Sequence, residues 1–196
     1  MRVLGITGSI GMGKSVLAAQ LKHLGVPTQN ADHSVHRLLA KGGAAEKAVK
    51  AAFPKAVGAQ GAIDRAALGK IVFADTEKRE QLEAILHPLV AEAEMRFAQR
   101  MQALGVKMVA FDIPLLFETG AEARCDAVIV ATAPGWLQRQ RVLSRPGMSE
   151  EKFAAILRAQ MSDAEKRARA DFVVKTGLGK AYSLRRLKEI MVMLDA

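Results

Sequence analysis

One stretch near the start of the chain has residue types and a spacing that suit a particular chemistry. Residues 8–15 read Gly-Ser-Ile-Gly-Met-Gly-Lys-Ser, which fills every fixed position of the pattern G-x-x-x-x-G-K-[ST]. Its glycines let the backbone approach a phosphate closely and adopt φ/ψ angles that other residues disfavour. Lys14 would reach the β- and γ-phosphates of a nucleotide, and the Ser15 hydroxyl would hold Mg²⁺.

The segments on either side of this loop agree with that interpretation. Residues 3–7 form a short apolar run typical of a buried strand. Leu17, Leu21 and Leu24 then fall on one face of a helix, and Gly25 stands where that helix would end. A strand, a glycine loop and a helix together turn backbone N–H groups toward an anion. The alternative, a chance glycine-rich turn, does not explain this context.

Two carboxylates follow other predicted strands. Asp32 comes shortly after a strand candidate at residues 26–29, and Asp112 ends an apolar strand at residues 106–112. In open parallel sheets, ligands bind beyond the carboxyl ends of the strands. Asp32 could accept a proton from a hydroxyl or could simply cap a helix. Asp112 could help to hold Mg²⁺ or could cap a turn.

The composition fits one α/β domain without disulfides or a membrane segment. The chain has 196 residues, of which 50% are hydrophobic and 5% aromatic, and it contains a single cysteine. No apolar run approaches the roughly 20 residues of a membrane span. The first residues enter the predicted strand without a charged leader or a cleavage site. We therefore expect a cytoplasmic protein with no membrane partner.

The formal net charge of +9 leaves several kinds of partner open. Many of the basic residues fall in the last third of the chain, scattered along predicted helices without interleaved aromatic residues. A basic surface can bind nucleic acid or a small polyanionic substrate, or it can be an ordinary solvated helical surface. No nucleic-acid-reading motif is present, so we expect no nucleic-acid partner.

The remaining chain predicts a helical insertion and a lid on a P-loop core. We expect the core at about residues 1–43, 106–135 and 170–196, the insertion at about 44–105 and the lid region at about 136–169. Asp64 and Thr76 are candidate N-caps in the insertion, and Pro88 is expected to break or kink its helix. Further strands are expected at 127–131 and 172–174, and an amphipathic helix at 179–195.

Motifs outside the loop decide between the classes of P-loop protein. The base-reading motif of GTPases and the signature of ABC-type ATPases are both absent, and helicase cores are usually larger. A small-molecule kinase fits, because it needs a substrate-binding insertion and a basic lid. Arg139, Arg141 and Arg145 are the lid candidates, with ordinary helix surface as the alternative.

Several segments, taken in order, resemble the dephospho-coenzyme A kinases. The resemblance covers residues 3 to about 175. Of the single motifs, only the glycine loop is specific, but the whole set of motifs in this order is highly specific for the family. The matching segments are residues 5–15, 30–32, 86–89 (Leu-His-Pro-Leu) and 112–118 (Asp-Ile-Pro-Leu-Leu-Phe-Glu), the pair Arg141 and Arg145, Gln160, and 170–171.

The resemblance implies a P-loop nucleoside-triphosphate hydrolase fold of the α/β class. It also implies transfer of the ATP γ-phosphate to the ribose 3′-hydroxyl of dephospho-coenzyme A, with Mg²⁺ as cofactor, by what we expect to be a monomer. The implied catalytic residues are Lys14, Asp32 and Arg141. The ATP-binding residues are Gly8, Gly11, Met12, Gly13, Lys14, Ser15, Val16 and Arg145; the substrate-binding residues are Asp32 and His87; the metal-binding residues are Ser15 and Asp112.

The chain departs from the family pattern at a few positions. Asn30 replaces the first Asp of a triplet, Val16 replaces a Thr after the loop, Pro146 follows Arg145, and Thr176-Gly177 stands for a late Asn-Gly. Two alternatives remain: another P-loop kinase of small molecules or nucleotides, and a nucleic-acid-binding protein.

Overall fold

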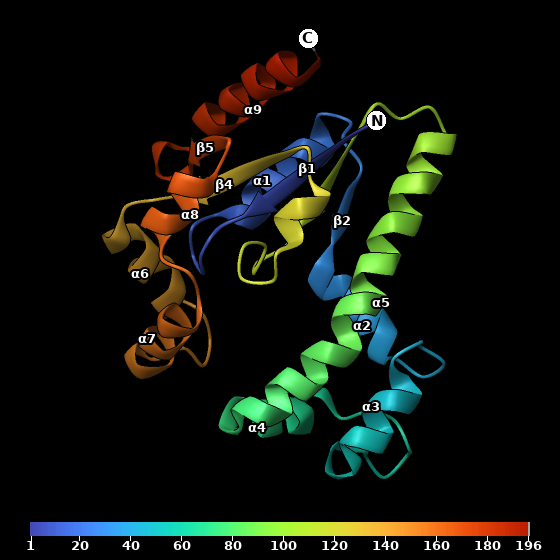
Figure 1. The fold of residues 1–196 in the computed structure, drawn as a ribbon. Helices are drawn as coiled ribbons and strands as arrows, with labels where there is room; N and C mark the ends of the chain where they lie inside the picture. Colours follow the sequence, from blue (N-terminus) through green and yellow to red (C-terminus); the bar gives the residue numbers. More distant parts are fainter. Residues whose placement is uncertain (196) are drawn as a thin grey trace. The chain divides into compact units, whose positions relative to one another are not determined.

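A five-stranded sheet forms the centre of the larger part of the chain. The computed structural model describes residues 1–195. The strand order is β2-β3-β1-β4-β5, and β1 pairs in parallel with β3 and β4, as β4 does with β5 (Figure 1). The strands are β1 (Arg2–Thr7), β2 (Thr28–Asn30), β3 (Met108–Asp112), β4 (Ala127–Thr132) and β5 (Phe172–Lys175). The apolar runs therefore form the expected strands, with β2 and β3 each starting two residues later than predicted.

The chain as a whole, in which helices account for most residues outside the sheet, divides into two compact units. One unit contains residues 1–29 and the chain from 101 onward, and the other contains residues 30–100. The helices are α1 (Lys14–His23), α2 (Ala31–Leu39), α3 (Glu46–Ala52), α4 (Arg65–Ala74), α5 (Thr76–Ala103), α6 (Gly135–Leu143), α7 (Glu150–Ala159), α8 (Asp163–Arg169) and α9 (Lys180–Asp195), with short 3₁₀ turns η1 (Pro54–Ala56), η2 (Ala121–Arg124) and η3 (Thr176–Leu178).

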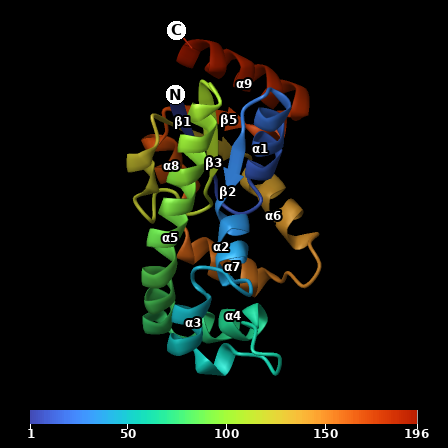
Figure 2. The same ribbon diagram turned by 90° about the vertical axis from the view of Figure 1, so that its right-hand side faces the viewer.

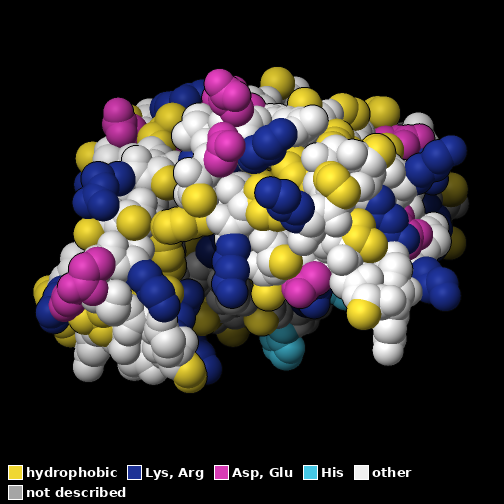
Figure 3. Space-filling view, turned by 90° about the horizontal axis from the view of Figure 1, so that it is seen from below, with side chains coloured by type: hydrophobic (Ala, Val, Ile, Leu, Met, Phe, Trp, Pro, Cys, Tyr) yellow, Lys and Arg dark blue, Asp and Glu magenta, His cyan; other side chains and the backbone are white. Residues whose placement is uncertain are grey.

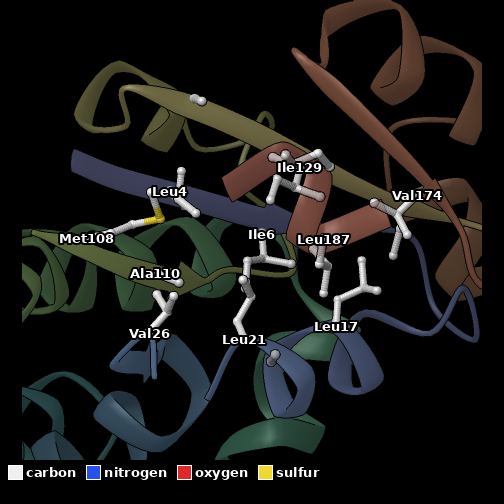
Figure 4. Packing of buried hydrophobic residues seen from close by; sticks show 14 residues of the cluster. Leu4, Ile6, Leu17, Leu21, Val26, Met108, Ala110, Ile129, Val174 and Leu187 are labelled. Atoms are coloured by element: carbon white, nitrogen blue, oxygen red, sulfur yellow. The ribbon is translucent and has the colours of Figure 1, made fainter. Parts of the chain in front are cut away.

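Helices α1 and α9 pack their apolar faces onto the sheet in the larger unit. Leu17 of α1 and Leu187 of α9 are fully buried against strand residues such as Ile6 and Ile129 (Figure 4). Burying one leucine contributes about 1.5–3 kcal/mol, so this layer fixes α1 firmly on the sheet. Because the loop at residues 8–13 joins β1 to α1, the same packing fixes both ends of the loop.

The smaller unit has its own apolar core. Its larger buried members come from α2 to α5 and the segments between them (Figure 2): Leu39, Val49, Phe53, Leu68 and Leu86. The helical segment expected at 44–105 falls largely within this unit. Since α2 contributes to the same core, the unit starts at residue 30.

The structure confirms one expected helix cap in this unit and corrects another. Asp64 caps α4, because its carboxylate accepts hydrogen bonds from the backbone N–H groups of Ala66 and Ala67 at 2.9 and 3.1 Å. Thr76 was the wrong residue for the next cap. Asp75 takes that place, with Oδ1 accepting from the N–H of Lys78 at 3.1 Å.

Of the two outcomes expected at Pro88, a break or a kink, the break is absent, since α5 runs without interruption from Thr76 to Ala103. Its ribbon bends instead, as Figure 1 shows. Apolar residues before and after the proline, Leu86 and Leu89, both pack on the core of the smaller unit. This packing offsets the cost of proline inside a helix, about 3 kcal/mol.

Among residues 1–195, no helix combines the length and the apolar character that crossing a bilayer requires.

Candidate active site

The loop between β1 and α1 has the backbone geometry that its glycines predict. Gly11 and Gly13 adopt φ angles of 77° and 94°, in the left-handed region that favours glycine. A Cβ atom on Gly11 would lie 2.6 Å from Cγ2 of Val142, and one on Gly13 would lie 2.6 Å from Oγ1 of Thr176. Both positions therefore need glycine for conformation and for space.

Lys14 lies next to a carboxylate at the end of the neighbouring strand. Its Nζ is 2.5 Å from Oδ1 of Asp112, and both side chains are largely buried. The register of β1 and β3 pairs Ile6 with Asp112, which brings the carboxylate to the edge of the sheet where the loop begins. The sheet thus brings together Lys14 and Asp112, which are far apart in the sequence.

The oxygen donors near Lys14 suit a magnesium ion that a nucleotide brings with it. Ser15 is exposed in the first turn of α1, and Asp112 supplies a carboxylate. No group of three or more His, Cys, Asp or Glu side chains that could hold a metal occurs within residues 1–195. Mg²⁺ usually binds through one or two protein oxygens together with phosphates and waters. The donor set of Ser15 and Asp112 fits that pattern.

The outer side of the loop is held by side chains from later elements. Gln138 of α6 donates to the carbonyl of Ile10 at 2.8 Å, and Gln160, which follows α7, accepts from the N–H of Ile10 at 3.0 Å. Gln160 is one of the residues that carry the family resemblance. These contacts fix Ile10 from both of its backbone groups.

The three arginines expected in the lid have different surroundings. Arg141 of α6 donates from Nη1 to the carbonyl of Gly11 at 3.3 Å. Arg139 is exposed and forms an ion pair with Glu150, and Arg145 is exposed just after α6. Of the three, Arg141 is the one that the structure brings to the loop.

Thr176 is a loop contact that the sequence analysis noted only as a departure from the family pattern. It is 6% exposed and begins η3 directly after β5. Its hydroxyl lies 2.6 Å from the carbonyl oxygen of Met12 and 3.1 Å from Nη1 of Arg141. No local pattern around residue 176 indicates such a contact, because the partners are distant in sequence.

Helix α8 and its buried lysine were also missed. Lys166 is fully buried, and its Nζ lies 2.8 and 2.9 Å from the two carboxylate oxygens of Glu118. The signal for α8 was present, since Ser162 and Glu165 have the spacing of a capping box. Hydrogen bonds from the Ser162 hydroxyl and backbone N–H hold the pKa of Glu165 below its usual value.

Asp32 and His87 belong to the smaller unit. Asp32 is exposed in the first turn of α2, and Asn30 is the residue that caps this helix, with Oδ1 accepting from the N–H of His33 at 2.9 Å. The capping alternative for Asp32 is therefore wrong. Asn caps a helix as well as Asp does, so Asn30, which departs from the family pattern, suits this position. His87 is exposed on α5, directly before Pro88.

Comparisons with known proteins agree on one family. The dephospho-CoA kinase family model matches residues 2–179. A dephospho-CoA kinase from Paramagnetospirillum magneticum is 54% identical over 194 residues, covering 99% of this chain and 91% of that protein. Another from Rhizobium meliloti is 51% identical over 196 residues, the full length of both chains.

A solved structure gives the same result. The dephospho-CoA kinase from Campylobacter jejuni superposes with a TM-score of 0.70 at 28% identity, covering 98% of this chain and 96% of that one. The loop, the parallel sheet and these matches lead to one conclusion. The chain belongs to the dephospho-CoA kinase family, and it is a phosphotransferase of the last step of coenzyme A biosynthesis.

Proposed function

We propose that this chain transfers the γ-phosphate of ATP to the ribose 3′-hydroxyl of dephospho-coenzyme A. The observation that carries the proposal is the Lys14–Asp112 pair, at 2.5 Å, at the end of a glycine loop held in left-handed geometry. Phosphoryl transfer depends mostly on positioning and on positive groups around the phosphoryl oxygens. A buried lysine beside such a loop supplies both.

The loop residues have separate roles in this proposal. Gly8, Gly11, Met12, Gly13 and Val16 line the site for the phosphates of ATP, in part through the helix N-terminus that begins at Lys14. The N–H groups of Met12 and Val16 donate to the carbonyls of Ser9 and Gly13 at 3.1 and 3.0 Å, so these two residues also hold the shape of the loop. Lys14 leaves Asp112 to contact the β- and γ-phosphoryl oxygens. Its charge is then shared with the phosphates in a site of low exposure, where electrostatic stabilisation is strong.

Magnesium would be held by the Ser15 hydroxyl and, directly or through water, by Asp112. The ion neutralises charge on the β- and γ-phosphates when it is bound. Arg141 adds a second positive group beside the loop, at its contact with Gly11. Arg145, which is exposed just after the end of α6, contributes to ATP binding in this proposal.

Asp32 acts on the acceptor hydroxyl. A hydroxyl is a poor nucleophile until a group nearby can accept its proton, and a carboxylate can do so. The role of Asp32 is supported by the finding that Asn30, and not Asp32, caps α2. His87 is exposed on α5, and in this proposal it takes part in binding the acceptor.

We also propose a cytoplasmic monomer without nucleic-acid or membrane partners. The distribution of the basic residues supports the absence of a nucleic-acid partner. On the face shown in Figure 3, Lys and Arg side chains are scattered among other types and do not form one continuous patch. A scattered charge of this kind suits a solvated surface better than a track for a phosphate backbone.

An ADP-release assay with dephospho-coenzyme A as acceptor tests the function, with nucleoside monophosphates as competing acceptors. We expect turnover with dephospho-coenzyme A and little with the others. Lys14→Ala should lower turnover on the order of a hundredfold or more, because a charge on the transferring group is lost. The melting temperature of this variant must be measured as well, since the change leaves the buried Asp112 without its lysine.

Two results would contradict the proposal. Preferred turnover of a nucleoside monophosphate would favour another P-loop kinase. Near wild-type turnover in a folded Lys14→Ala protein would remove the phosphate-binding role of the loop.

A further inference from the structure

We propose that Thr176 is a positioning residue that sets the orientation of the peptide between Met12 and Gly13 in the phosphate-binding loop. This inference rests on the proposed function, because it concerns how the loop receives ATP. Thr176 lies 164 residues from Met12 in sequence, yet its Oγ1 is 2.6 Å from the Met12 carbonyl oxygen. The hydroxyl donates this bond, since a carbonyl can only accept.

The geometry of the peptide unit links this bond to the phosphate side of the loop. In a planar trans peptide, C=O and the following N–H point in opposite directions. When Thr176 holds the carbonyl of Met12, the N–H of Gly13 is directed to the opposite side of the loop. In glycine loops of this kind, N–H groups directed inward bind phosphate oxygens.

Arg141 holds Thr176 from a second direction. Its Nη1 donates to the Thr176 hydroxyl at 3.1 Å and its Nη2 to the Thr176 carbonyl at 3.2 Å. The same Nη1 also lies 3.3 Å from the carbonyl oxygen of Gly11. The hydroxyl therefore accepts from Arg141 while it donates to Met12. This arrangement leaves the threonine side chain no freedom to rotate without losing a bond.

Packing supports the same assignment. Thr176 is 6% exposed, and its Oγ1 would lie only 2.6 Å from a Cβ added to Gly13. The carbonyl oxygen of Thr132 at the end of β4 is a second acceptor 3.3 Å from the hydroxyl, and the shorter distance of 2.6 Å assigns the single hydroxyl proton to Met12. The loop thus packs at Gly13 against the buried Thr176, and the Thr176 hydroxyl is the polar group at this contact.

Thr176→Val tests the role, because it removes the hydroxyl and keeps the branched shape. We expect kcat/KM for ATP to fall about tenfold. This is less than the roughly hundredfold cost of removing such an N–H donor, because the N–H group of Gly13 is misdirected but still present. The KM for dephospho-coenzyme A should stay within about twofold of wild type. Thr176→Ser keeps the hydroxyl and should restore the value for ATP.

Thr119→Val is the matched control. Thr119 is exposed, and its hydroxyl donates to the carbonyl of Leu115 in its own turn. This variant should retain wild-type kinetics. Thr176→Ala serves as a second variant without the hydroxyl if the valine variant does not fold.

The outcomes separate this inference from the proposed function. No transfer to dephospho-coenzyme A by the wild-type protein would refute the function itself. With an active wild type, a folded Thr176→Val or Thr176→Ala protein with ATP parameters within about twofold of wild type would refute only the role of Thr176. So would a Thr176→Ser variant as impaired as Thr176→Val, because the hydroxyl would then not be the group that matters.

Discussion

At the scale of single residues, Asp32 is where chemistry and local structure can be separated most cleanly. An aspartate in the first turn of a helix can stabilise the helix through its charge or through a cap. Asn30 caps this helix, so the exposed carboxylate of Asp32 is not needed as the N-cap. A loss of function at this position can then be assigned to proton transfer or to orientation of the acceptor.

Asp32→Asn should fold and bind ATP with little change, yet lose transfer activity by on the order of a hundredfold, because an amide cannot accept the proton. Single-turnover kinetics and thermal unfolding of the same sample provide the measurement. Asp64→Asn is the control: it is an exposed cap in the same unit, where Asn serves as well as Asp. Normal turnover in Asp32→Asn would mean that the proton acceptor lies elsewhere.

At the scale of elements, α8 is joined to the segment that follows β3 by an ion pair whose lysine is fully buried and whose glutamate side chain is 18% exposed. Lys166 has no exposed surface, while Glu118 also accepts a bond from the N–H of Met161 at 2.9 Å. Lys166 additionally lies 3.4 Å from the carbonyl oxygen of Pro114, two residues after Asp112. The helix therefore holds the segment that leads away from Asp112.

Lys166→Met should lower the free energy of unfolding by about 3 kcal/mol, because it leaves the Glu118 carboxylate without its buried partner. The double variant with Glu118→Gln should recover much of this loss, since the amide is neutral and still accepts from Met161. Urea unfolding measures both changes. Arg167→Met is the control, because its pair with Asp163 is more exposed and should contribute less than about 1 kcal/mol. Equal stability of wild type and Lys166→Met would contradict the role of this pair.

At the scale of the whole molecule, the loop belongs to the larger of two compact units, and its two ends are fixed by the sheet and by α1. A ligand that binds only the folded loop stabilises the folded state by mass action. Thermal unfolding therefore reports ATP binding without reference to turnover.

MgATP at about 100 times its Kd should add about 2.7 kcal/mol of stability. For a chain of this length, that corresponds to a rise in Tm of about 5–10 °C. AMP lacks the β- and γ-phosphates and should give a much smaller rise, and Lys14→Ala should reduce the response to MgATP. Equal shifts with AMP and ATP would argue against phosphate binding by the loop.

The sequence by itself determined the features that depend on neighbouring residues. The glycine pattern with Lys14 and Ser15, the apolar runs of the strands and the Asp64 cap are local, because periodicity and short-range hydrogen bonds fix them. Local rules failed at Thr76, where the neighbouring aspartate caps the helix. At Pro88 they left open a break or a kink, and packing on the core of the smaller unit keeps α5 continuous.

Only the tertiary structure decided the contacts that arrange the loop. Lys14 and Asp112 are 98 residues apart, Arg141 and Thr176 are 35 apart, and Lys166 and Glu118 are 48 apart. No spacing along the chain encodes these pairs. They form because the strand order places β3 and β4 on either side of β1, so that segments distant in sequence end at the same edge of the sheet.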